Sequence, residues 1–371
     1  MKIVIDLTSL NDNFSGIERY ALNISLNLIK QDNTNKYVLL FKNEIHNDFK
    51  EYIDNKNIEV RVIKGKNKLF FNQVKLLFEL MKVKADKYLF LAFPSPILFR
   101  RKGIINTIHD LTAFLFPKTM KLKSRLYFKY SIINAVKISE HVITVSQTSK
   151  KDIVNRFKVN NISVVSNGIS EVFENFIFNY EKNCYIKEKY GLPEDYILSL
   201  GTLEPRKNLK LLINAFIDLK IEKRIDKKLV LVGRKGWKLE DVIGDLDPKI
   251  INDNIIFTGF VDDEDLPYIY INSQFFVFPS MYEGFGIPVI EAGAMNCLVI
   301  SSDIEVMVEI LGEDLVYFNS NNIESLKNTI CEVVGYSEEK KSIIRSKLKE
   351  NTKKYNWKVE STKLFYLLNR L

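Results

Sequence analysis

The chain has 371 residues, 46% of them hydrophobic and 27% charged, a composition typical of globular proteins and a length that suits two domains. Three scattered cysteines without metal-ligand spacing argue against a disulfide framework and a zinc site, and they favour a reducing compartment. The net charge of +8 favours the binding of anionic partners. Because no apolar stretch approaches the roughly 20 residues of a membrane helix, we expect a soluble or peripheral protein.

Short apolar runs alternate with helical patterns from the start of the chain. The first run, 3–7, soon turns polar, so it predicts a buried strand rather than a signal peptide, and a helix is predicted at 17–30. Further strands are predicted at 36–41, 59–63, 88–92, 104–108, 141–145 and 162–165. This alternation is typical of a parallel, doubly wound sheet.

A second series of the same kind begins at Tyr196. Its strands are predicted at 196–201, 228–233, 254–258, 274–278 and 297–301, and a helix is predicted from Asn208. Two such series predict two Rossmann-like domains, 1–172 and 173–355, because the rhythm breaks near 167–183. The stretch 337–371 is helical with an apolar end, which packs either on its own domain or, from about residue 356, on the first.

The stretch FPSMYEGFGIPVIEAG (278–293) places Glu283 and Glu291 eight residues apart between a predicted strand and a predicted helix. Pro288 suits the first turn of that helix because its missing N–H would be unsatisfied there. Glycines allow a ligand to approach the backbone closely, and a helix N-terminus attracts phosphate. A carboxylate there accepts hydrogen bonds from a sugar diol, so the pattern indicates a sugar-nucleotide site. An ordinary strand–loop–helix with two exposed glutamates is the alternative. Four further candidates for ligand contacts lie between the glutamates: Gly284, Phe285, Gly286 and Ile287.

This segment resembles the E-x7-E signature of the retaining glycosyltransferases of family 4, and the resemblance covers nearly the whole chain. It is carried also by SGIERY (15–20), HDLT (109–112), VITVSQTSKKDI (142–153), VSNGI (165–169), LGTLEPRKNL (200–209) and LVGRKGW (231–237). The resemblance implies the α/β GT-B fold, with two Rossmann-like domains facing across a cleft and the last helix crossing back to the first domain. It implies an acceptor-binding first domain, 1–172 joined by about 356–371, and a second, nucleotide-sugar-binding domain, 173–355.

Two basic residues precede the helix predicted from Asn208. Arg206 and Lys207 suit a diphosphate leaving group, whose negative charge grows as the glycosidic bond breaks. In similar enzymes an arginine follows the strand's glycine directly, and a lysine comes five residues later. Lys207 matches that lysine, but Thr202 stands at the arginine position, which leaves Arg206 as the substitute.

His109 and Asp110 follow the strand predicted at 104–108, at the end of a strand where ligands bind in α/β sheets. The resemblance implies that this pair lies over the donor sugar, and the alternatives are a histidine satisfied by backbone and an aspartate that caps a helix. Gly16 matches the glycine whose N–H approaches the donor phosphate in similar enzymes. Arg234 is a candidate for nucleotide binding, although a solvated turn explains it nearly as well.

The acidic run 262–265 imitates the metal-binding DxD motif of the other major glycosyltransferase fold. Its context, GFVDDEDLPYIY, predicts instead a helix N-terminus that Asp262 or Asp263 caps. We therefore expect no metal ion and no cofactor beyond the nucleotide-sugar donor.

The whole pattern predicts a cytoplasmic, retaining, metal-independent glycosyltransferase that most resembles bacterial mannosyltransferases of O-antigen and capsule synthesis. GDP-mannose is the leading donor, and a saccharide, lipid-linked in our interpretation, is the acceptor. Transfer of glucose, N-acetylglucosamine or rhamnose from a UDP- or dTDP-sugar is an alternative. A non-catalytic scaffold that binds a sugar nucleotide is the alternative of another class.

Basic residues gather with aromatic and aliphatic ones in 64–84 and 100–129. One interpretation is a face that rests on anionic lipid at the inner side of the plasma membrane. The other is an amphipathic helix packed on the core. No nucleic-acid motif accompanies the charge, so we expect no nucleic-acid partner.

Overall fold

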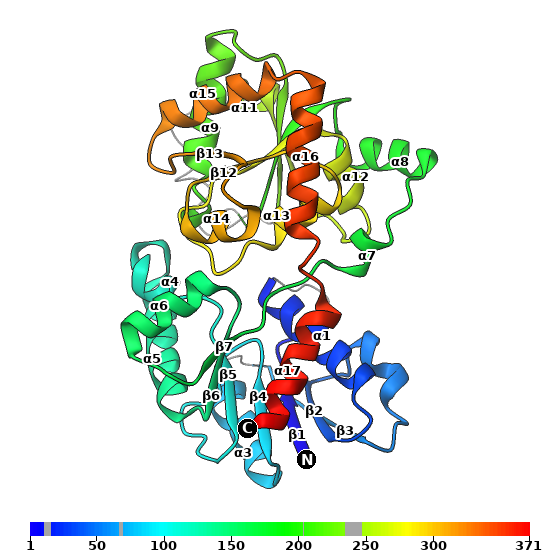
Figure 1. The fold of residues 1–371 in the computed structure, drawn as a ribbon, viewed down its shortest axis with the longest axis vertical. Coiled ribbons are helices and arrows are strands. Elements are labelled where there is room, and N and C mark those ends of the chain that lie inside the picture. Colours follow the sequence, from blue (N-terminus) through cyan, green and yellow to red (C-terminus); the bar gives the residue numbers. More distant parts are fainter. Residues whose placement is uncertain (11–15, 67–69, 203, 234–246) are drawn as a thin grey trace. The chain divides into compact units, whose positions relative to one another are not determined.

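The computed structural model describes residues 1–10, 16–66, 70–202, 204–233 and 247–371. The chain forms two compact units, the first from 1–167 with 356–371 and the second from 168–355. The polypeptide therefore crosses from one unit to the other twice (Figure 1). The first crossing, which was expected after residue 172, lies after residue 167.

Among its described residues the first unit contains a seven-stranded parallel sheet in the order β3-β2-β1-β4-β5-β6-β7. The side chains of Ile3, Val4 and Ile5 in the first strand are almost completely buried, as expected for a parallel strand covered on both faces. The strands are β1 Lys2–Asp6, β2 Lys36–Lys42, β3 Ile58–Ile63, β4 Lys87–Phe90, β5 Ile104–Thr107, β6 His141–Thr144 and β7 Ile162–Val164.

Helices lie between most of these strands, whereas β4 leads to β5 without one. A π-helical turn, Phe71–Lys75, leads directly into α3. Ser146 caps α6, because its side chain accepts a hydrogen bond from the Ser149 N–H. The helices of this unit are α1 Gly16–Gln31, α3 Leu76–Lys82, α4 Thr112–Leu115, α5 Leu122–Ile138, α6 Gln147–Phe157 and α17 Trp357–Arg370.

The last helix, α17, belongs to the first unit and packs along α1. Asn356 caps its N-terminus, and the Gln31 side chain forms hydrogen bonds with Ser361 (2.9 Å) and Thr362 (2.7 Å). Leu364 and Leu368 of this helix are buried. The predicted return of the terminal helix to the first domain is thus confirmed, and the alternative of packing on its own domain is wrong.

Among its described residues the second unit contains a six-stranded parallel sheet in the order β10-β9-β8-β11-β12-β13. The predicted strands agree with the observed ones to within about two residues, but β13 was not predicted. The strands are β8 Tyr196–Leu200, β9 Lys228–Val232, β10 Ile255–Gly259, β11 Ser273–Phe278, β12 Val299–Ser302 and β13 Val316–Phe318.

Most helices of the second unit surround this sheet, and α8 (Tyr180–Tyr190) extends away from it (Figure 1). Leu212, Ile213 and Phe216 of α9 are fully buried in its core. The helices are α7 Glu171–Glu174, α8 Tyr180–Tyr190, α9 Leu209–Ile221, α11 Pro248–Asn254, α12 Leu266–Ile271, α13 Ile287–Ala294, α14 Glu305–Leu311, α15 Ile323–Val334 and α16 Glu338–Thr352.

Each sheet has a point where its strand order reverses. In the first unit β2 and β4 flank β1, and in the second unit β9 and β11 flank β8. The loops that leave adjacent strands at such a point turn to opposite faces of the sheet and open a crevice at the carboxyl ends of the strands, where α/β proteins bind ligands. The candidate sites therefore lie after β1 and β4 and after β8 and β11.

Candidate active site

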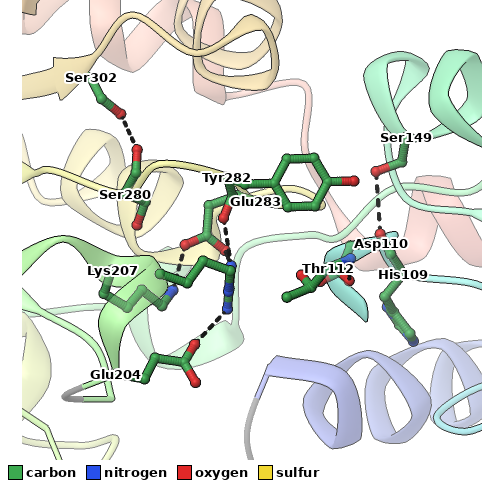
Figure 2. Close-up of polar contacts among 11 residues, drawn as sticks. His109, Asp110, Thr112, Ser149, Glu204, Lys207, Ser280, Tyr282, Glu283 and Ser302 are labelled. Atoms are coloured by element: carbon green, nitrogen blue, oxygen red, sulfur yellow. Dashed lines mark hydrogen bonds and ion pairs between the residues drawn. The ribbon is translucent and has the colours of Figure 1, made fainter. Parts of the chain in front are cut away.

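In the second unit, the loop after β8 and the turn after β11 bring three charged side chains together. Both oxygens of Glu283 are paired: Oε1 with Lys207 Nζ and Oε2 with Arg206 Nη1, each at 2.6 Å (Figure 2). The cations are 76 and 77 residues from the glutamate in the chain. The strands β8 and β11 are hydrogen-bonded neighbours, which explains why such distant residues meet.

The pKa of Glu283 reflects its position between two cations. The residue is only 7% exposed, and burial alone would raise the pKa of its carboxyl group. The charges of Arg206 and Lys207, with their hydrogen bonds, outweigh this effect and lower the pKa to about 2. Glu283 is therefore ionised at neutral pH and is not a general acid there.

Arg206 also contacts Tyr282 and Glu204, and neither contact was predicted. Its Nη1 donates to the Tyr282 carbonyl oxygen at 2.6 Å, and its Nη2 pairs with Glu204 at 2.8 Å. Glu204 lies two residues before Arg206 in the chain, and this short spacing could have indicated the ion pair. Together the two cations and two glutamates carry no net charge, so an anionic ligand would compete with the glutamates for the cations.

The turn that carries Glu283 is held by backbone contacts. The Met281 N–H donates to the Arg206 carbonyl oxygen (3.0 Å), and the Ser302 hydroxyl donates to the Ser280 carbonyl oxygen (2.6 Å; Figure 2). Lys207 Nζ also lies 5.4 Å from the ring centroid of Phe278, the last residue of β11. The cluster is thus built onto the end of a strand, which keeps its geometry precise.

The second glutamate, Glu291, lies in α13 and is only 2% exposed. The Tyr270 hydroxyl, from α12, lies 3.1 Å from Glu291 Oε2 and 3.2 Å from the Pro288 carbonyl oxygen. This tyrosine was not predicted, because nothing in the local sequence of α12 relates it to α13. It holds the carboxylate in place within the protein.

The residues between the glutamates shape the start of α13. Gly286 is the N-cap residue with φ +112°, a value that favours glycine, and a Cβ there would lie 2.7 Å from Met307 Cε. Ile287 and Pro288 form the first helical positions, and no side chain caps the helix. Phe285 is buried edge-on against Tyr355, with centroids 5.0 Å apart, so its contact is with the core. Gly284 is also buried.

In the first unit, His109 and Asp110 follow β5. The His109 Nε2 lies 2.9 Å from the Leu91 carbonyl oxygen, which requires a proton on Nε2 and leaves Nδ1 as an acceptor. Burial lowers the pKa of His109, so the ring is neutral at pH 7. Tyr20 packs edge-on against this ring at 5.0 Å.

Asp110 contacts the start of a helix, although the N-cap residue of that helix is Leu111. Its Oδ1 accepts a hydrogen bond from the Thr112 N–H (2.8 Å) at the start of α4. The Ser149 hydroxyl donates to the His109 carbonyl oxygen at 3.2 Å, which holds the loop against α6 (Figure 2).

The remaining candidates are spread over both units. Gly16 is exposed and begins α1, and Thr202 is exposed two residues after the end of β8. Arg234 lies outside the described residues. The structure thus brings Arg206, Lys207 and Glu283 into one cluster, and it places His109, Asp110 and Gly16 in the first unit.

The acidic run 262–265 is engaged in ion pairs. Lys189 Nζ pairs with Asp265 (2.8 Å) and with Asp262 (3.1 Å), and the N-cap residue of α12 is Asp265, without a side-chain capping bond. The predicted capping of α12 by Asp262 or Asp263 is therefore wrong.

Among the described residues, no group of three or more histidine, cysteine, aspartate or glutamate side chains is arranged to hold a metal ion. Nor does any helix in the described ranges have the length and apolarity needed to cross a membrane.

Two family descriptions match this chain, one for each half. "Glycosyltransferase Family 4" matches residues 14–172, and "Glycosyl transferases group 1" matches residues 186–355. The division between the two matches lies close to the first crossing between the units.

Two bacterial proteins are similar to this chain over part of its sequence. The O-antigen chain mannosyltransferase B of Escherichia coli is 30% identical over 236 residues, which are 63% of this chain and 61% of the relative. The O-antigen chain mannosyltransferase RfbU of Salmonella typhimurium is 34% identical over 229 residues, 60% of this chain and 59% of the relative. The chain thus matches about three fifths of the length of these relatives.

In fold, the whole chain is similar to Anabaena Alr3699/HepE, whose crystal structure was solved in complex with UDP and glucose. The TM-score is 0.74 at 16% identity, and the alignment covers 100% of both chains. This likeness confirms the GT-B fold, with two Rossmann-like domains, that the resemblance implies.

Proposed function

Since the chain belongs to the glycosyltransferases of the GT-B fold, we propose that it transfers a hexose, with retention of anomeric configuration, from a nucleotide sugar to a saccharide acceptor. Mannose from GDP-mannose is the donor that we favour, and the acceptor is a lipid-linked saccharide of bacterial surface polysaccharide synthesis. The names of the two relatives, both O-antigen chain mannosyltransferases, support the choice of sugar.

The observation that carries this proposal is the cluster of Arg206, Lys207 and Glu283 at the point where the strand order of the second sheet reverses. A nucleotide sugar brings a diphosphate with two negative charges. Two fixed cations, and the uncapped start of α13 in the adjacent turn, suit that diphosphate. The charge on the diphosphate grows as the sugar leaves, so preorganised cations stabilise the transition state more than the bound donor. In this proposal the basic residues replace a metal ion.

Glu283 lies beside the cations, at the place where the sugar joins the diphosphate in a donor bound this way. We assign it to hydroxyl groups of the donor sugar. Its low pKa keeps it an acceptor of hydrogen bonds, and its two ion pairs make it a poor nucleophile. Both properties argue against a covalent glycosyl-enzyme, which needs a nucleophilic carboxylate and a separate acid.

Retention then follows from attack on the face that the diphosphate leaves. The bond between the anomeric carbon and the diphosphate oxygen breaks as the acceptor oxygen bonds to that carbon. The proton of the acceptor hydroxyl passes to the departing diphosphate. From the resemblance we assign His109 to the donor sugar, and its unprotonated Nδ1 suits a hydroxyl donor.

Glu291 is assigned to the ribose hydroxyls of the nucleotide. A carboxylate accepts from both hydroxyls of a cis diol, and Tyr270 holds one of its oxygens in a defined position. We retain Gly16, Gly284, Gly286 and Ile287 as backbone contacts of the donor. Phe285 packs on Tyr355, so its role is to support the turn.

A membrane surface is the proposed location of the acceptor, and α5 supports this. Four exposed apolar side chains of this helix, at i, i+4, i+8 and i+11, share one face: Leu122, Leu126, Tyr130 and Ile133. Exposed Lys121, Lys123 and Lys137 lie close to them in the sequence. An apolar stripe with cationic neighbours suits the inner, anionic face of a plasma membrane.

The test is incubation of the whole protein with GDP-mannose, UDP-glucose, UDP-N-acetylglucosamine and dTDP-rhamnose, with and without EDTA. Slow hydrolysis of GDP-mannose in preference to the others, with EDTA present, is the expected result, and it needs no acceptor. Preference for another donor would support the alternative sugar. Binding without hydrolysis or transfer of any donor would favour a non-catalytic scaffold.

A further inference from the structure

The first unit contains a cavity of about 360 Å³ at the point where its own strand order reverses. Three loops line it: 6–10 after β1, 42–47 after β2 and 93–96 after β4, together with Asn72 and Leu76. Its volume is at the lower end of the range for small-molecule sites, which suits a ligand of one or two sugar rings. None of the residues that line it belongs to the cluster around Glu283.

A carboxylate with one open oxygen lies in this cavity. Asp6 Oδ1 accepts hydrogen bonds from the Thr8 N–H (3.0 Å) and the Thr8 hydroxyl (2.7 Å). Among the described residues, Oδ2 has no hydrogen-bond partner. Burial raises the pKa of Asp6, and the bonds from Thr8 only partly offset this effect. A further donor on Oδ2 would stabilise the ionised carboxylate, because a buried charge is costly without partners.

Lys42 lines the same cavity and, among the described residues, forms no ion pair with Asp6. In the part of the chain that the structure describes, Lys42 Nζ forms no ion pair and no hydrogen bond, and it lies 5.0 Å from the centroid of the Phe71 ring. A carboxylate and a cation that line the same cavity offer both an acceptor and a donor of hydrogen bonds, which suits a neutral molecule that has both hydroxyl donors and oxygen acceptors.

The third wall is apolar and rigidly held. Phe93, Pro94 and Pro96 form it. The Ser95 N–H donates to Asn106 Oδ1 (2.8 Å), and the Ile97 N–H donates to Gln73 Oε1 (2.9 Å), so these two side chains fix the loop. A preformed apolar wall opposite a few polar groups binds a ring without a large entropic cost, and it suits the C–H face of a sugar.

We propose that this cavity binds a neutral sugar ring of the acceptor, with Asp6 accepting from its hydroxyl groups and Lys42 donating to its oxygens. The ring packs against Phe93. This inference rests on the proposed transfer to a saccharide, and it adds the residues and the uncharged character of the acceptor. Asp6 and Lys42 are therefore specificity-determining residues that contact the acceptor and not the donor.

The test is direct binding of methyl α-D-mannopyranoside to the whole protein without nucleotide, observed by saturation-transfer difference NMR. We expect saturation of the ring protons with wild type. Asp6→Asn and Lys42→Met should each weaken binding about tenfold or more, the effect of losing a hydrogen bond to a charged group. Asp54→Asn removes an exposed carboxylate of the same unit outside the cavity, and it should bind like wild type. The matched probe methyl α-D-mannopyranosiduronate, which carries a carboxylate, should bind more weakly than the neutral glycoside.

Several results would overturn the proposal. These are no saturation with wild type, unchanged binding in Lys42→Met, or tighter binding of the uronate than of the neutral glycoside. Lys42→Met decides the question even if Asp6→Asn fails to fold, because the only polar or cation–π contact of Lys42 Nζ among the described residues is the one with Phe71. Donor hydrolysis is measured separately on wild type. Hydrolysis without glycoside binding refutes the cavity assignment alone, and binding without hydrolysis refutes the proposed function.

Discussion

Replacement of Glu283 by glutamine removes the negative charge between Arg206 and Lys207 and changes the shape of the side chain little. The pKa of Glu283 is about 2, against an ordinary value of 4.5. Each pH unit corresponds to about 1.4 kcal/mol, so the ionised carboxylate with its two ion pairs, net of the cost of burial, stabilises the folded second unit by about 3 kcal/mol at neutral pH. The loss of one partner from a buried ion pair commonly costs 3–5 kcal/mol, which agrees with this estimate.

The pH dependence of this effect has a defined sign. Because the folded pKa is below the unfolded one, the stabilisation is complete above about pH 4.5 and is lost as the pH falls toward 2. Wild type should therefore be more stable than Glu283→Gln by about 3 kcal/mol at pH 7, and the two should approach each other below about pH 4.5.

The same substitution should change ligand binding and turnover in opposite directions. In the proposed site the diphosphate competes with Glu283 for both cations. Their release should tighten the binding of GDP by about tenfold, which corresponds to about 1.4 kcal/mol. Turnover should fall, because the sugar hydroxyls lose their acceptor.

The assays are urea unfolding by circular dichroism at several pH values and calorimetric titration with GDP. Glu350→Gln, which changes an exposed glutamate of α16, is the matched control and should alter stability by less than about 0.5 kcal/mol. Equal stability of wild type and Glu283→Gln at pH 7 would refute the electrostatic reasoning. Weaker GDP binding by the variant would refute the competition between Glu283 and the diphosphate.

Four further outcomes are expected. Lys207→Ala should lower turnover more than it raises the donor KM, since its charge acts mainly in the transition state; steady-state kinetics showing only a raised KM would contradict this. Glu291→Ala should weaken nucleotide-sugar binding by about 1.5–3 kcal/mol in calorimetry, the range for hydrogen bonds to a charged group, and unchanged affinity would exclude the ribose contact. His109→Ala should bind nucleotide normally but lose most of the transfer rate. Because burial lowers the pKa of His109, the wild-type rate should show no loss from its protonation above about pH 6.5. Leu126→Ser with Tyr130→Ser should reduce co-sedimentation with vesicles that contain phosphatidylglycerol; equal sedimentation of variant and wild type would argue against the α5 face.

Much of the architecture could be predicted from the order of residues alone. Parallel strands are buried on both faces, so each reads as a short apolar run, and the runs at 3–7 and 274–278 correspond to β1 and β11. The turn with Glu283 was predicted for a local reason as well, because glycine and proline mark the start of α13. Among the strands of the described residues, β13 was the one that was not predicted.

The tertiary structure decided which of these residues meet. Strand order places β8 beside β11 and brings Lys207 to Glu283 across 76 residues, although the chain at each position contains no sign of the other. Tyr270 with Glu291, and Asp6 with Lys42 in one cavity, depend in the same way on the packing of separate elements. Hydrophobic periodicity reports whether a residue is buried, whereas the partner of a buried charge is set by the direction of its side chain and by the neighbour that the fold provides.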